Sequence, residues 1–107
     1  MGQRSLEQSS QELQAVFEEL LESRNVYYNP PASVKMKYDA IVFSRSDIAN
    51  TFANNRVYKQ DHRYTVTTIT EDPDATIIDK VSKLPMCSFD RHFVSDNLHH
   101  NVFNLYY

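Results

Sequence analysis

Glycine is nearly missing from this chain: of its 107 residues, only Gly2 is a glycine. Loops that cradle phosphates and dinucleotide-binding fingerprints need several glycines, because their backbone approaches the ligand closely and adopts positive φ. The sequence therefore excludes these nucleotide-binding motifs. Turns must instead be made by asparagine, aspartate and proline, which favour turn conformations for other reasons.

Cysteine and long apolar runs are equally scarce. Cys87 is the single cysteine, so no disulfide can form within the chain, and a reducing compartment, or one where redox is irrelevant, fits best. No run approaches the roughly 18 apolar residues that cross a bilayer, and residues 1–5 lack a signal-peptide core. Leu6 stands where N-myristoylation of Gly2 would need Ser or Thr. We expect a soluble, unprocessed protein without a membrane partner.

A surplus of basic residues is also missing, since the formal net charge is -3. Nucleic-acid binders usually carry clustered Lys and Arg that displace counterions from phosphates. One short stretch could still form a stacking platform for bases; it comprises Arg56, Tyr58, Lys59, Arg63 and Tyr64. Asp61 and the acidic residues 71–74 weaken its positive field. We therefore expect no specific nucleic-acid binding.

The apolar residues that are present suffice for one domain. The hydrophobic fraction is 41%, and seven Tyr and six Phe contribute much of it. A chain of this length buries roughly two-thirds of the surface that it exposes when unfolded, which supports a single core. We expect one α+β domain over residues 1–107, with residues 1–8 as the candidate flexible segment.

Two segments have the apolar spacing of an amphipathic helix. The first is predicted over residues 9–23, with Ser9 and Glu12 as a capping box, although Ser5 and Gln8 offer an earlier start. Its glutamates are interpreted as a solvated face rather than an acid-base pair. The second helix is predicted over residues 73–83, between Asp72-Pro73 and Pro85.

The remaining periodic stretches are rich in β-branched and aromatic residues, as strands are. They are residues 25–28, 34–43, 62–70, 87–94 and 101–107, together with a hairpin, counted as one element, that is formed by residues 48–53 and 57–59. The stretch 62–70 is expected to be central, with Tyr64 and Val66 on one face. The sequence predicts an α+β fold with a single mostly antiparallel sheet and two helices packed on one face, in the order α-β-β-β-β-α-β-β.

A hairpin around Asn54-Asn55 is the candidate subunit contact. Asparagine tolerates the left-handed turn conformation when glycine is missing. The hairpin mixes polar residues with aromatic ones and is only half suited to a monomer's core, so its aromatic residues could anchor a partner. The interface candidates are Phe52, Asn54, Asn55, Arg56 and Tyr58. A surface hairpin with ordinary cross-strand aromatic pairs explains the same pattern.

Reactive side chains gather in the last third of the chain. A metal site could be drawn from Asp90, His92, His99 and His100, with Cys87 nearby, but the ligands are not paired at zinc-site spacing. Strand alternation places Asp90 and His92 on one face and Cys87 on the other. We expect no metal and no cofactor.

A Cys87–His92 nucleophile pair, oriented by Asp90 or Asp96, is the catalytic alternative. Such a thiolate needs an electropositive, partly open setting. Cys87 instead falls in phase with Phe89 and Phe93, which predicts burial in an apolar layer. We expect no catalytic residue, and Asp90-Arg91 is interpreted as an ion pair at the rim of the sheet.

A series of elements over residues 25–107 carries a family resemblance. It comprises Val26-Tyr27-Tyr28 before the prolines, Ile41-Val42-Phe43, Arg63-Tyr64-Thr65-Val66-Thr67, Asp72-Pro73-Asp74, Asp79-Lys80, Leu84-Pro85, Ser88-Phe89-Asp90-Arg91-His92, Asp96-Asn97-Leu98 with His100, and Leu105-Tyr106-Tyr107. The series resembles small proteins of long-tailed bacteriophages encoded between the capsid and tail genes, of the tail terminator and tail-completion group. The chain departs from that pattern at Asn54, where aspartate is expected, and at Asp39-Ala40, where a proline is expected.

The resemblance implies a virion structural protein without catalytic residues. Its subunits would form a homo-oligomeric ring, expected to be a hexamer, that caps the tail tube and joins it to the head. The implied partners are a second copy, the tail tube protein and a head-closure or connector protein. The implied location is the tail or neck of the virion, and the host cytoplasm during assembly. The alternatives are a head-closure or head-tail connector protein and, more distantly, a small Cys/His enzyme.

Overall fold

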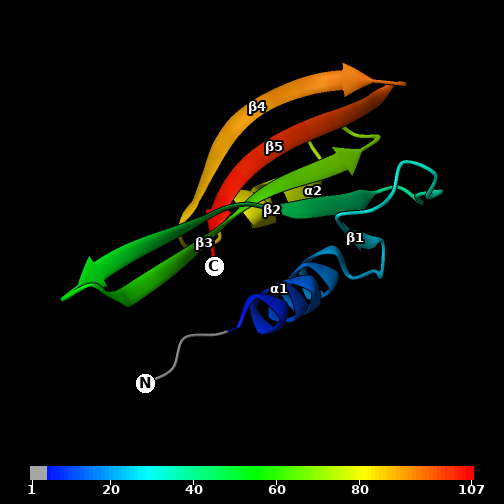
Figure 1. The fold of residues 1–107 in the computed structure, drawn as a ribbon. Helices are drawn as coiled ribbons and strands as arrows, with labels where there is room; N and C mark the ends of the chain where they lie inside the picture. Colours follow the sequence, from blue (N-terminus) through cyan, green and yellow to red (C-terminus); the bar gives the residue numbers. More distant parts are fainter. Residues whose placement is uncertain (1–4) are drawn as a thin grey trace.

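Two helices and five strands form the structure, a computed structural model that describes residues 5–107 apart from the side chains of residues 57–59. In chain order they are α1 (Leu6–Leu21), β1 (Val26–Tyr28), β2 (Ala40–Ala53), β3 (Arg56–Thr70), α2 (Thr76–Ser82), β4 (Cys87–Ser95) and β5 (Leu98–Tyr106). The strands make one sheet in the order β1-β2-β3-β5-β4 (Figure 1). The short β1 is parallel to β2, and every other pair is antiparallel.

The predicted α+β class is confirmed, with two helices and a mostly antiparallel sheet in the predicted order. One detail differs: the hairpin strands are not separate but continue from the core strands. β2 runs unbroken from Ala40 to Ala53, and β3 from Arg56 to Thr70. Three strands therefore precede α2 where four were expected, and the hairpin is an extension of the central sheet.

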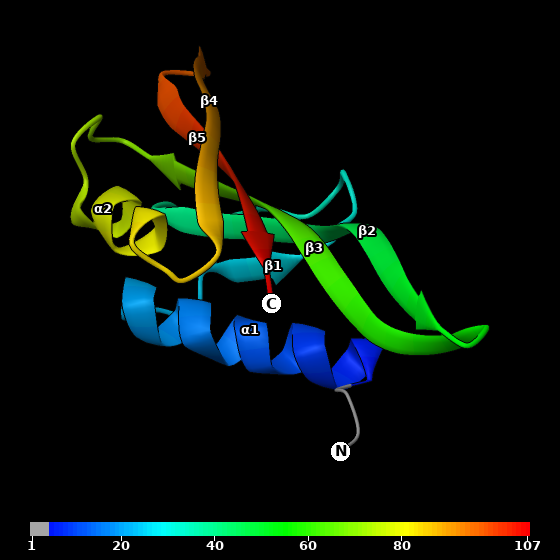
Figure 2. The same ribbon diagram turned by 90° about the vertical axis from the view of Figure 1, so that its left-hand side faces the viewer.

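The core lies between one face of the sheet and both helices. The strand register places Phe43, Val66 and Phe103 in one row across β2, β3 and β5. Phe17 of α1 packs edge-on against Phe43, with ring centroids 5.2 Å apart, and Val81 of α2 joins the same cluster. Figure 2 shows α1 running along this face with α2 near one end of it. The apolar side chains of alternate strand residues thus pack against apolar side chains that recur every three or four residues along the helices.

Helix α1 starts three residues before the predicted position, at the earlier of the two candidate caps. The Ser5 hydroxyl accepts a hydrogen bond from the Gln8 amide at 3.0 Å. Ser9 is instead inside the helix and fully buried. A buried serine in the second turn is explained by its partner, the Tyr64 hydroxyl at 2.8 Å, which no local pattern could indicate.

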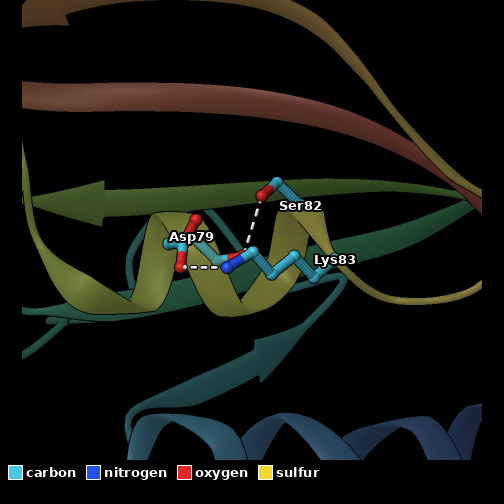
Figure 3. Close-up of polar contacts among 3 residues, drawn as sticks. All are labelled: Asp79, Ser82 and Lys83. Atoms are coloured by element: carbon cyan, nitrogen blue, oxygen red, sulfur yellow. Dashed lines mark hydrogen bonds and ion pairs between the residues drawn. The ribbon is translucent and has the colours of Figure 1, made fainter.

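Helix α2 is shorter than predicted because the residues after Asp72 form a turn before the helix begins. The Asp72 side chain accepts the Asp74 amide at 2.8 Å, so aspartate stabilises that turn rather than capping the helix. The end of the helix is close to the predicted one. There Asp79 pairs with the Lys83 ammonium at 2.9 Å and its carbonyl accepts the Ser82 hydroxyl at 2.7 Å (Figure 3).

The stretch 34–39 was predicted as strand and is a loop. Its backbone bonds to side chains rather than to a neighbouring strand: the Tyr27 hydroxyl accepts the Lys37 amide at 3.2 Å, and the Asn25 side chain donates to the Asp39 carbonyl at 3.3 Å. Strand pairing begins only at Ala40. The alternation of Lys35, Met36 and Lys37 was therefore not a strand signal.

The final strand, β5, lies inside the sheet between β3 and β4. The Tyr107 amide donates to the His62 carbonyl at 3.0 Å, just beyond the last registered pair, Arg63 with Tyr106. As expected, the last residues of the chain are part of the sheet, and β3 is its central strand with Tyr64 and Val66 fully buried.

Candidate functional site

The most prominent surface feature is the end of the β2–β3 hairpin, residues 46–62, which we call the arm. β5 pairs with β3 only from Arg63 to Thr70, so the arm is a ribbon of two strands that extends past the sheet. It projects at the lower left of Figure 1, at the opposite end of the molecule from the β4–β5 turn. An isolated two-stranded ribbon is only marginally stable in water, which makes an unsupported arm a candidate for binding a partner.

The tip of the arm carries the predicted interface residues. Asn54 and Asn55 form the turn with φ of 53° and 63°, the left-handed conformation expected of them. Phe52 is 64% exposed, and Asn54, Asn55 and Arg56 are also exposed. Tyr58 lies on β3, but its side chain is outside the described residues. The structure thus brings four of the five candidates together on one projecting tip.

The arm leaves the sheet through a polar junction. Ser46 interrupts the register between Arg45 and Asp47, and its hydroxyl donates to the Arg63 carbonyl at 3.2 Å. The Arg45 guanidinium lies 5.6 Å from the centre of the Tyr64 ring and donates to the Leu6 carbonyl at 2.9 Å. These contacts join the base of the arm to α1 and fix the direction in which the arm departs. The polar run 44–47 gave no sign in the sequence that the strand continued.

The edge strand β4 forms a second exposed apolar surface. Phe89 is 57% exposed, and Phe93 and Val94 are exposed as well. Phe89 packs edge-on against Phe103 at 5.7 Å, whereas Phe93 stacks on His100 at 4.6 Å. Exposed apolar residues on an edge strand are typical of a protein-protein contact, because the strand also presents unpaired backbone groups.

The predicted alternation along β4 is wrong, because a β-bulge changes it. Phe89 is opposite Phe103 and Arg91 is opposite Val102, so Asp90 is an extra residue. Beyond the bulge the faces exchange: His92, opposite Asn101, lies on the same face as Cys87, and Phe93 lies on the other face. The ion pair of Asp90 with Arg91 is confirmed at 2.6 Å.

Cys87 and His92 share a face but lie too far apart along β4 for a hydrogen bond between their side chains. Their partners on β5, Leu105 and Asn101, are four residues apart, which corresponds to about 13 Å along the strand. Cys87 is half-buried, and desolvation raises the pKa of its thiol. A raised pKa lowers the fraction of nucleophilic thiolate at neutral pH.

The histidines bond to one another and to the backbone. His92 Nε2 lies 3.1 Å from His99 Nδ1, and His100 Nδ1 lies 3.1 Å from the Leu98 carbonyl oxygen. The turn at Asp96-Asn97 sets this pair, because it places Val94 opposite His99 and His92 opposite Asn101. The predicted strands 87–94 and 101–107 had instead left His99 in the connecting loop. Among the described residues, no three His, Cys, Asp or Glu side chains are grouped closely enough to hold a metal ion.

An apolar groove lies where α1, the loop after α2 and the end of β5 meet. It is lined by Leu13, Val16, Leu84, Pro85, Met86, Leu105, Tyr106 and Tyr107, with a volume of about 280 Å³. Met86 is 71% exposed on its rim. The lining residues come from three distant parts of the chain, so sequence inspection could not find the groove.

Compared with known proteins, the chain matches no family model and no curated protein. Within residues 5–107, no helix has the length and apolar character needed to span a membrane.

Proposed function

We propose that this chain is a virion structural protein of a long-tailed bacteriophage, a ring-forming subunit of the tail terminator type. It caps the tail tube and joins it to the head through the neck. It acts by assembly in the host cytoplasm and remains in the tail or neck of the virion. Its partners are further copies of itself, the tail tube protein and a head-closure or connector protein. No catalytic residue is needed for this role.

The observation that carries the proposal is the arm. A subunit that assembles in a ring must offer two different surfaces, because each copy contacts one neighbour on either side through a head-to-tail interface. The arm, with exposed Ile48 and Phe52, is well suited to one such surface. It lies at one end of a molecule whose longest dimension is 51 Å, so it can reach a neighbour.

The exposed edge strand gives a further surface for the tube or the neck. β4 presents Phe89 on one face and Phe93 on the other, so a partner can either extend the sheet or cover it. The family resemblance in the sequence supports the phage assignment. Its most specific elements, Asp96-Asn97-Leu98 with His100 and Leu105-Tyr106-Tyr107, lie in the turn after β4 and along β5. A head-closure or connector protein is the alternative role for the same two surfaces.

Electron microscopy of the purified protein, alone and mixed with cognate tail tubes, tests this function. We expect rings on one end of each tube, and tubes that no longer lengthen when tube protein is added. Binding to the isolated connector without any effect on tubes would instead identify the head-closure role. Tubes that stay uncapped and continue to grow, with no ring in either sample, would contradict the ring-forming function.

A further inference from the structure

We infer that the apolar groove receives the Phe52 side chain from the arm of a second copy of this chain. The inference rests on the proposed ring-forming function and identifies the contact that joins adjacent subunits. In this contact the exposed Phe52 side chain of one copy lies in the apolar groove between α1 and the end of β5 of the next copy.

The groove suits an aromatic side chain better than a metabolite. Small-molecule pockets usually measure at least about 300 Å³ and include placed polar groups that fix the orientation of the ligand. This groove has about 280 Å³ and is lined mainly by aliphatic side chains and Met86. An apolar cavity of about 150 Å³ already accommodates benzene, so a phenyl ring fits with room for neighbouring atoms.

Phe52 is the most exposed aromatic residue among the described side chains. Phe89 and Phe93 each contact a ring of β5, whereas Phe52 makes no ring contact among the described residues. Aromatic side chains that fill a pocket are the usual energetic centres of protein interfaces. Burial of Phe52 would also support a two-stranded ribbon that extends past the sheet.

The groove that Phe52 fills must belong to another copy. Tyr107 at the groove bonds to His62 at the base of the arm, while Phe52 is opposite Val57, five residues further out. Five residues of strand span about 17 Å. The arm points away from its own groove, so the groove must belong to another copy, and in the proposed ring this contact is head-to-tail.

Charge agrees with this arrangement. Arg56, opposite Ala53, is exposed next to Phe52 at the tip of the arm. The exposed Glu19 lies on α1, three residues after groove residue Val16 and so on the same side of the helix. A tip with an exposed arginine therefore approaches an exposed carboxylate beside the groove.

Cysteine trapping between two differently labelled chains tests the contact. In a Cys87→Ser background, one chain carries Phe52→Cys and the other Met86→Cys, and the mixture is oxidised with diamide under assembly conditions. We expect a covalent dimer that contains one chain of each kind. The matched control replaces Phe93, an exposed aromatic residue of β4, with cysteine and should give little dimer with the Met86→Cys chain.

A second measurement uses Phe52→Asp, which should fold normally because the side chain is exposed. We expect its melting temperature to be unchanged and its half-assembly concentration to rise by about thirtyfold, the loss of one interface centre. Assembly equal to wild type, Phe52–Phe52 dimers, or trapping through Phe93 would overturn the inference and leave ring formation intact. A wild-type protein that remains monomeric even with tail tubes would overturn both.

Discussion

The hydroxyl groups of Ser9 and Tyr64 lie 2.8 Å apart, although 55 residues separate them in the sequence. The bond joins α1 to the central strand inside the core, where both residues are fully buried. It lies next to the base of the arm, because Tyr64 also supports the Arg45 guanidinium. The hydrogen bond therefore links the position of α1 to the part of β3 from which the arm extends.

Removal of either hydroxyl should destabilise the fold. We expect Ser9→Ala and Tyr64→Phe each to lower the free energy of unfolding by about 1 kcal/mol, because the remaining hydroxyl loses a buried partner. The double variant should lose less than the sum of the two single losses, since both remove the same bond. Urea denaturation of the four proteins measures this coupling, and strictly additive losses would show that the bond is not formed.

Two threonines on the same face of β3 make a matched pair. The Thr70 hydroxyl donates to the Asp72 carbonyl at 2.8 Å, whereas the buried Thr68 hydroxyl has no hydrogen-bond partner within the described residues. Thr70→Val should lower the free energy of unfolding by about 1 kcal/mol, and Thr68→Val should leave it unchanged or raise it. Thermal melts of the two variants compare the sites, and an equal loss at both would contradict this difference.

Removal of Tyr106 and Tyr107 should unfold or disassemble the protein. Their amides donate to the Met86 and His62 carbonyls at 3.1 and 3.0 Å, and both side chains line the groove. The deletion breaks pairing inside the sheet rather than at a free end. Circular dichroism melts and sedimentation of the truncated protein test this, with deletion of residues 1–4 as the control. Unchanged melting and assembly would contradict the prediction.

The Cys87 thiol should react slowly at neutral pH. Burial raises its pKa, so the folded protein favours the neutral thiol. The contribution of this thiol to the free energy of unfolding is fully present below the pKa of the thiol in the unfolded chain. It is lost as the pH rises through the higher pKa of the thiol in the folded protein. We expect slower labelling by a thiol reagent than in the urea-unfolded chain, and alkaline destabilisation that Cys87→Ser removes. Labelling as fast as in the unfolded chain would show that the thiol is accessible and activated.

The sequence indicated the fold class where local patterns and tertiary packing agree. The helical spacing around Leu13 and Phe17 and the alternation of Tyr64 and Val66 both match the observed core. The helix start was ambiguous between Ser5 and Ser9, because the deciding contact is with Tyr64. The predicted strand at 34–39 failed because alternating Lys and Met there reflect a loop bonded to Tyr27 and Asn25.

The surfaces were less predictable than the fold. Asn54-Asn55 correctly indicated the turn of the arm, since few residues other than glycine adopt positive φ so readily. The bulge at Asp90 could not be predicted from the sequence. One inserted residue reverses which side chains face each side of the sheet, but it leaves the strand-like composition unchanged. The groove depends on the meeting of Leu13, Leu84 and Leu105, which are distant in sequence and share no motif.

Sedimentation velocity over a range of concentrations, with and without cognate tail tube protein, tests ring formation most directly. The account predicts one discrete assembled species of about six 12.5 kDa subunits, near 75 kDa, which is also the repeating mass bound at tube ends. A 12.5 kDa monomer at every concentration in both conditions, or an open-ended series of masses, would contradict it.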